Sequence, residues 1–68
     1  MKAVSGKKMV TILEKRGWEL DRITGSHHIL KKSGIDKAIV VPVHGNRALK
    51  IGLQRAIMKI AGLGESDL

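Results

Sequence analysis

Two short glycine-containing turns divide the middle of the chain into three strand-forming segments. The turns are 24–26 (Thr-Gly-Ser) and 33–36 (Ser-Gly-Ile-Asp), and the segments around them are 18–23, 27–32 and 37–43. Connections this short cannot carry the chain across a sheet to a parallel partner, so consecutive segments must pair as antiparallel hairpins. The sequence therefore predicts a three-stranded antiparallel meander with the 27–32 strand in the middle.

An amphipathic helix is predicted before the meander. Ser5 is a favourable N-cap residue, and Met9, Ile12 and Leu13 fall on one helix face. Gly17 is suited to a left-handed helix end. The opposite face is interpreted either as a solvated face or as one edge of a phosphate-binding surface, and it contains Lys7, Lys8, Glu14 and Lys15.

A second amphipathic helix is predicted after the meander, ending at Gly62. The stripe predicted to face the core consists of Leu49, Leu53, Ala56, Ile57 and Ile60. The residues predicted to lie largely off this stripe are Lys50, Gln54, Arg55 and Lys59. The polar tail 63–68 is predicted to fray or to form one short turn.

The predicted fold class is therefore α+β, with elements in the order α-β-β-β-α. We expect a three-stranded antiparallel sheet with two helices on one face and its other face open to solvent. A chain of 68 residues has room for one domain, 1–68. Double-stranded-RNA-binding domains have the same order of elements, so the predicted fold is double-stranded-RNA-binding-domain-like, although element order alone does not give function.

The chain is strongly basic. Thirteen Lys and Arg residues against six Asp and Glu residues give a formal net charge of +7, which favours nucleic acid as a partner, although small domains also use charge for solubility. The single aromatic residue, Trp18, argues against a platform that stacks single-stranded bases. Because the chain lacks cysteine and its longest apolar run is only 38–43, we expect no thiolate metal site, no membrane span and a cytoplasmic location.

The segment Gly25-Ser26-His27-His28 holds two of the three histidines of the chain. Adjacent strand residues point to opposite faces, so one imidazole is expected to face the helices and the other the open face. A strand histidine is often only a half-buried or solvated spacer. An imidazole also transfers protons near neutral pH, which makes this segment a candidate for acid–base catalysis.

Cations near the histidine pair predict binding of a phosphodiester and stabilisation of the charge that develops on it during cleavage. The candidate RNA-binding residues are Arg22, Lys31 and Lys32, together with Lys7 and Lys8 of the first helix. A metal site is not expected, because the carboxylates are scattered and two neighbouring strand histidines diverge. No cofactor is expected either.

Four short motifs follow one another along the chain: Gly17-Trp18, Gly25-Ser26-His27, Val41-Pro42-Val43-His44 and a closing IMKIAGL. Together they resemble the HicA, or YcfA-like, toxin family of type II toxin–antitoxin systems. The resemblance implies an mRNA interferase that cuts RNA without a metal and is inhibited by a HicB-type antitoxin. It also implies that His27, which directly follows Gly-Ser, is the catalytic histidine.

Two functions of different classes are consistent with these observations. In the first, the protein is a toxin that cleaves mRNA, with His27 as general acid or base and the RNA 2′-hydroxyl as the attacking group. His28 and His44 are possible supporting residues, and the second acid or base is His44, a lysine or water. In the alternative, the chain is a non-catalytic double-stranded-RNA-binding module. Gly25-Ser26-His27 favours the enzyme, because a pure binding module has no obvious need of it.

Overall fold

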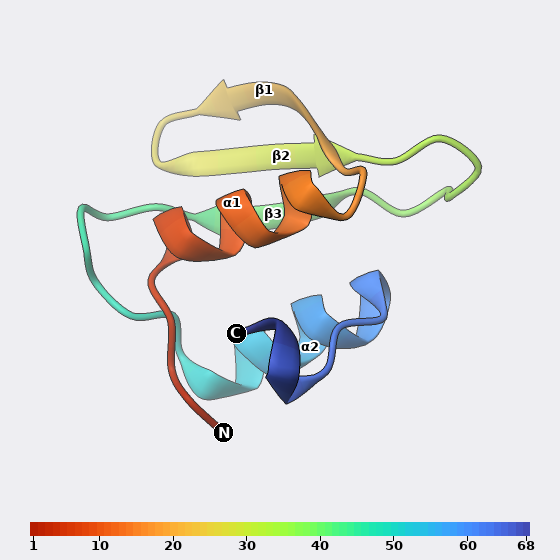
Figure 1. Ribbon diagram of the computed structural model, residues 1–68. Coiled ribbons are helices and arrows are strands. Elements are labelled where there is room, and N and C mark those ends of the chain that lie inside the picture. The colour runs from red at the N-terminus through yellow and green to blue at the C-terminus, as the bar shows by residue number, and fades with distance from the viewer.

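The first helix, α1, is delimited by local capping. The computed structural model describes residues 1–68, and α1 spans Gly6–Lys15 (Figure 1). The Ser5 side chain accepts a hydrogen bond from the Lys8 amide at 3.0 Å, and Gly17 follows the helix with a φ of 91°. The predicted core face is confirmed, since the buried residues of α1 include Met9, Ile12 and Leu13.

The predicted antiparallel meander is also confirmed. The strands are β1 (Glu19–Thr24), β2 (His27–Lys31) and β3 (Ile39–Pro42), and they lie in the order β1-β2-β3. The third strand is shorter than the predicted 37–43, because residues 32–38 form a turn and an irregular loop. Pro42 is the last residue of β3, as expected for a residue that cannot donate a ladder hydrogen bond.

The strand register divides the sheet into a covered face and an open face. One row of aligned residues consists of Ile23, His28 and Val41, and Val41 is completely buried. The next row along the strands consists of Thr24, His27 and Pro42, and His27 is exposed. Because successive strand residues alternate between faces, the first row faces the helices and the second row faces solvent.

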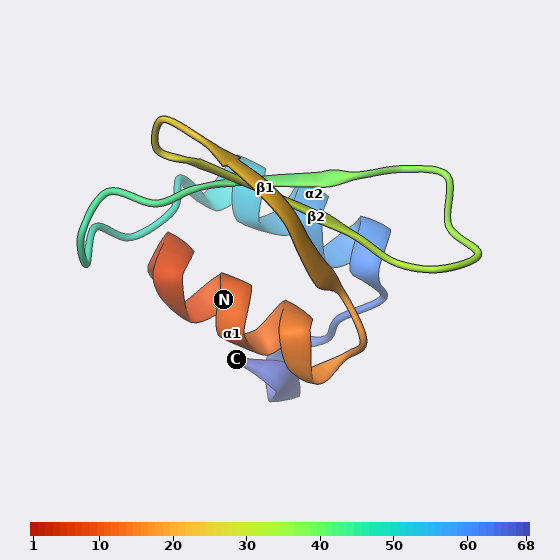
Figure 2. The same ribbon diagram turned by 90° about the horizontal axis from the view of Figure 1, so that it is seen from above.

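Both helices and the sheet share one hydrophobic core. Helix α1 lies across the sheet, and α2 (Ile51–Ala61) lies beyond β3 (Figures 1 and 2). The main cluster joins Met9 and Leu13 of α1, Leu30, Ile39 and Val41 of the sheet, and Ile57 and Met58 of α2. The α+β class and the α-β-β-β-α order are therefore as predicted. Neither helix has the length and apolar composition of a membrane span.

The predicted buried stripe of α2 is wrong at three positions. Leu53 is 37 % exposed and Ala56 is exposed, whereas Gln54 is completely buried. The Gln54 Oε1 accepts a hydrogen bond from the Val4 amide at 2.9 Å, and its Nε2 donates to the Lys2 carbonyl at 2.7 Å. These two bonds satisfy a buried amide side chain and attach the N-terminal segment to α2.

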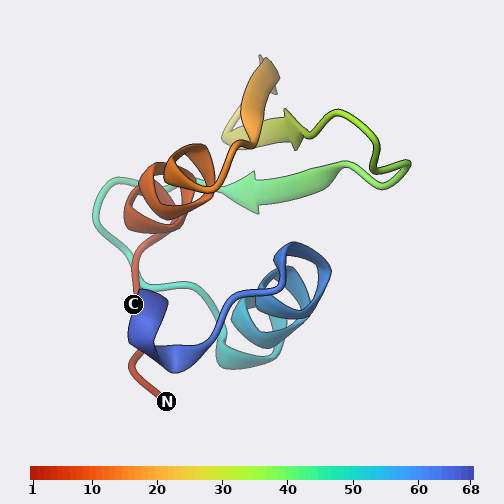
Figure 3. The same ribbon diagram turned by 45° about the vertical axis from the view of Figure 1, so that its right-hand side comes forward.

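The C-terminal tail forms one short helical turn, one of the two outcomes predicted for it. This turn, η1 (Glu65–Asp67), follows a link that runs back from the end of α2 (Figure 3). The Asp67 carboxylate accepts hydrogen bonds from the Gly64 amide and from the Arg16 guanidinium. These hydrogen bonds lower the pKa of Asp67 below its ordinary value of 3.8, and the bond from Gly64 has the larger effect.

Candidate active site and RNA interface

The β1–β2 turn presents His27 at the start of β2. Thr24 and His27 close the hairpin as paired residues, and the loop between them is Gly25-Ser26. Gly25 has a φ of 59°, and no residue other than glycine has a positive φ. A two-residue loop with glycine first matches a type II′ hairpin turn. The backbone therefore needs Gly25, and His27 is the residue of this motif whose side chain could act as a general acid or base.

The two adjacent histidines face opposite sides of the sheet, as predicted. His27 is exposed on the open face, between its register partners Thr24 and Pro42. His28 is half-buried beside Val41, and its Nδ1 atom is buried without a hydrogen-bond partner. Of this pair, His27 is thus the imidazole that can meet a substrate approaching the open face.

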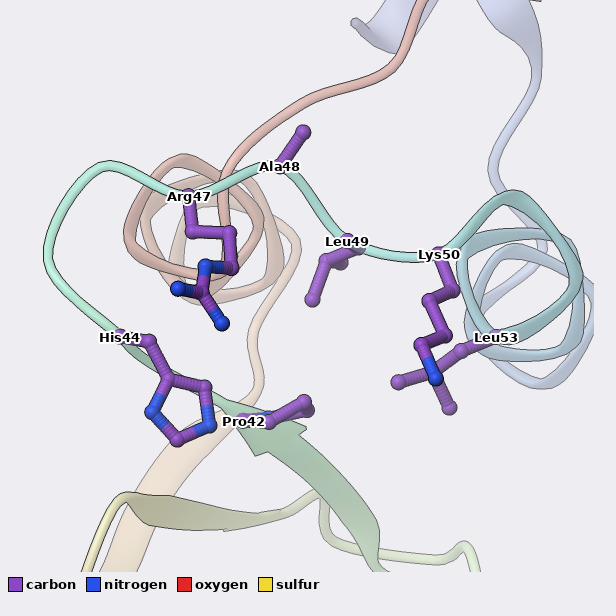
Figure 4. Close-up of a pocket in the computed structure, with 7 residues that line it drawn as sticks. All are labelled: Pro42, His44, Arg47, Ala48, Leu49, Lys50 and Leu53. Carbon is purple, nitrogen blue, oxygen red and sulfur yellow. The ribbon is translucent and has the colours of Figure 1, made fainter.

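A pocket of about 410 Å³ opens at the end of β3 (Figure 4). It is lined by Pro42, His44, Arg47, Ala48, Leu49, Lys50 and Leu53. Pro42 is the register partner of His27, and the Val43 amide donates a hydrogen bond to the Ser26 carbonyl at 2.7 Å. The strand pairing therefore continues past β3 and brings His44 to the same end of the sheet as the β1–β2 turn. Figure 1 shows the connection from β3 to α2 leaving the sheet at that end.

Three of the predicted RNA contacts are engaged within the chain. Arg22 and Lys31 are exposed, and both pair with the Asp21 carboxylate, at 2.7 Å and 3.6 Å. The Lys32 Nζ donates to the Arg16 carbonyl at 2.8 Å, at the C-terminal end of α1, where a cation is favourable. Lys32 therefore has a structural partner, and the other two cations are partly neutralised by a neighbouring carboxylate.

Lys7 and Lys8, the other two predicted contacts, are exposed in the first turn of α1. The helix dipole makes cations unfavourable at the N-terminal end of a helix, and this turn contains no acidic residue that would offset the two lysines. Gly6, the first residue of α1, packs directly on the end of β3, since a Cβ atom at this position would overlap the Pro42 carbonyl oxygen. The first turn of α1 thus lies at the same end of the sheet as His27.

The pocket contains two cations, Arg47 and Lys50, that were not predicted from the sequence to contact RNA. Both are exposed, and neither takes part in any of the four ion pairs of the protein. The sequence does contain a signal for them, because the short segment 44–50 holds a histidine and two cations directly after a strand. Their location beside the partner of His27 becomes visible only in the structure.

The three histidines lie in different surroundings: His27 on the open face, His28 on the covered face and His44 in the pocket. No three His, Asp or Glu side chains come together in a way that could hold a metal ion. The side chains at this end of the sheet include imidazole groups and cationic groups.

Comparison with protein families gives a match over nearly the whole chain. The family model described as "HicA toxin of bacterial toxin-antitoxin" matches residues 6–63 of the 68. The chain belongs to the HicA toxin family. The match runs from the first residue of α1 to beyond the end of α2 and confirms the resemblance found in the sequence motifs. No curated protein sequence matches the chain. As a HicA toxin it has an antitoxin as its partner.

Proposed function

We propose that this HicA-family toxin is an mRNA interferase, an endoribonuclease of the cytoplasm in which His27 is the general acid or base. The observation that carries the proposal is the exposed His27 side chain on the helix-free face of the sheet, beside a pocket with His44 and two cations. Histidine is the side chain that most often serves as a general acid or base, and such proton transfer contributes about 10²- to 10⁴-fold to a reaction rate.

The proposed reaction is a transesterification within the RNA strand. The 2′-hydroxyl gives up its proton to a base, its oxygen attacks the adjacent phosphorus, and the bond from phosphorus to the 5′-oxygen breaks. The departing 5′-oxygen takes up a proton from an acid, leaving a 2′,3′-cyclic phosphate and a 5′-hydroxyl. His27 fills one of these two roles, and His44, a lysine or water fills the other.

Charge supports RNA as the substrate. The net charge of +7 attracts a polyanion, and nearby cations stabilise the negative charge that develops on the phosphoryl oxygens. Lys7 and Lys8 add to this, because an RNA phosphate beside the first turn of α1 would offset their unfavourable position on the helix dipole. Arg22 and Lys31 contribute on the open face, where RNA would compete with Asp21 for them.

The first test compares RNA and DNA of the same sequence in excess EDTA. We expect the purified toxin to cut the RNA and to leave the DNA intact, because the attacking group is the ribose 2′-hydroxyl and the histidine route needs no metal. Gel analysis of end-labelled strands measures the cleavage of the RNA and of the DNA. Cleavage that requires one particular divalent ion, or RNA binding without cleavage, would contradict the proposal, and the second result would favour a non-catalytic RNA-binding module.

We further propose that a HicB-type antitoxin inhibits the toxin by covering the open face of the sheet. This face combines the cations Arg22 and Lys31 with the apolar residues Ile29 and Val40, and Val40 is 43 % exposed. An antitoxin surface with carboxylates around an apolar centre is complementary to it. We expect the antitoxin to cover the site directly rather than to distort it, because both helices and the sheet share one core in this small chain.

Hydrogen exchange tests this mode of inhibition. In the complex of the toxin with its antitoxin, we expect slower exchange of the β2 amides and loss of both RNA binding and cleavage. The free toxin is the reference for both measurements. An inhibited complex in which β2 exchanges as fast as in the free toxin would show that the antitoxin acts elsewhere.

A further inference from the structure

The pocket at the end of β3 has the composition of an anion site. Two cations and one histidine line it, namely Arg47, Lys50 and His44, and no acidic residue does. We propose that this pocket binds one phosphate of the RNA strand, next to the linkage that is cleaved at His27. This inference rests on the proposed ribonuclease function and adds to it a defined phosphate subsite.

The shape of the pocket agrees with this assignment. Figure 4 shows the Arg47 and Lys50 side chains extending from the β3–α2 loop toward the side of the pocket formed by Pro42. Leu49 and Leu53 form an apolar part of the pocket wall. Apolar surroundings lower the local dielectric constant and so strengthen the interaction of a cation with a phosphate. A volume of about 410 Å³ accommodates a phosphate together with water or part of a ribose.

The position of the pocket relates it to the reacting linkage. Pro42 belongs to the pocket wall and is also the register partner of His27. Paired residues of antiparallel strands have Cα atoms about 4.5–5.5 Å apart. An RNA strand with one phosphate at His27 therefore reaches the pocket with a neighbouring phosphate.

The pocket cations are also more available to RNA than the cations of the open face. Arg22 and Lys31 must give up contacts with Asp21 before they pair with a phosphate, whereas Arg47 and Lys50 have no ion pair to break. Because they hold a phosphate that does not react, they are positioning residues. Their loss should raise KM and leave kcat close to its original value.

The test removes both pocket charges and compares the result with a matched control. The double variant Arg47→Gln/Lys50→Gln loses two exposed charges in the pocket, and Arg55→Gln/Lys59→Gln loses two exposed charges on α2 outside it. We expect KM to rise about 10–100-fold in the pocket variant. We also expect the slope of log affinity against log salt concentration to become shallower by about 0.7–0.9, the value for one phosphate contact. We expect the control variant to show neither this rise in KM nor this change in the salt slope.

A modified RNA identifies the phosphate. A methylphosphonate, which carries no charge, is introduced at each linkage next to the cleaved one. One of these substitutions should weaken binding to the unmodified toxin and have no further effect on the pocket variant. Equal salt slopes for the pocket variant and the control, or equal methylphosphonate penalties in both proteins, would overturn the subsite. Failure of the unmodified toxin to cut RNA would instead overturn the proposed function, and the salt slopes with intact RNA would still test the subsite.

Discussion

Replacing His27 with alanine is expected to reduce the rate of RNA cleavage by about 10²- to 10⁴-fold, the contribution of a general acid or base. The side chain is exposed on the open face, so its removal should change the free energy of unfolding by no more than about 0.5 kcal/mol. Single-turnover cleavage of an end-labelled RNA measures the rate, and thermal unfolding followed by circular dichroism measures the stability.

His28→Ala is the control for this variant. It removes an imidazole from the neighbouring position of β2, but one that faces the covered side of the sheet. We expect His28→Ala to retain most of the cleavage rate of the unmodified toxin. An equal loss of cleavage in both variants, with both still folded, would contradict the assignment of a single catalytic histidine on the open face.

Replacing Gly6 with alanine is expected to destabilise the protein strongly, although the change adds only one methyl group. The new Cβ atom would overlap the Pro42 carbonyl oxygen, which is part of the backbone and has no rotamer to change. Crowding of this kind costs about 1–3 kcal/mol or more. In a domain of this size each kcal/mol lowers Tm by about 4–8 °C, which thermal unfolding measures directly.

Gly52→Ala is the matched control, because Gly52 is also near the start of a helix and has no atom within contact distance of its missing Cβ. Alanine favours the helix by up to about 1 kcal/mol relative to glycine, so this variant should unfold at a higher temperature than the unmodified toxin. A Gly6→Ala variant as stable as Gly52→Ala would show that α1 does not pack on the end of β3 as described.

Features determined by neighbouring residues could be predicted from the sequence. The hairpin at Gly25-Ser26, the Ser5 cap and the opposite orientations of His27 and His28 each depend on a few consecutive residues. A two-residue loop enforces antiparallel pairing, and the alternation of strand residues then separates the two histidines without knowledge of the rest of the fold.

Features that depend on residues far apart in the sequence could not be predicted. The partners of Gln54 lie in the segment Lys2–Val4 at the other end of the chain, so helical periodicity alone assigned its side chain to solvent. Likewise, Lys32 meets the end of α1 only after the sheet has folded against that helix. The pocket cations belong to the same class, since the pairing of β3 with β2 is what brings the β3–α2 loop to His27.

An RNA that lacks a single 2′-hydroxyl tests the proposed reaction of the toxin most directly. Once the cleaved linkage is known, the ribose on its 5′ side is replaced by deoxyribose and the two strands are incubated with the toxin in EDTA. We predict no cleavage at that linkage in the modified strand, and a 2′,3′-cyclic phosphate at the end of the fragment from the unmodified strand. Unchanged cleavage at the deoxyribose linkage would contradict the proposed reaction.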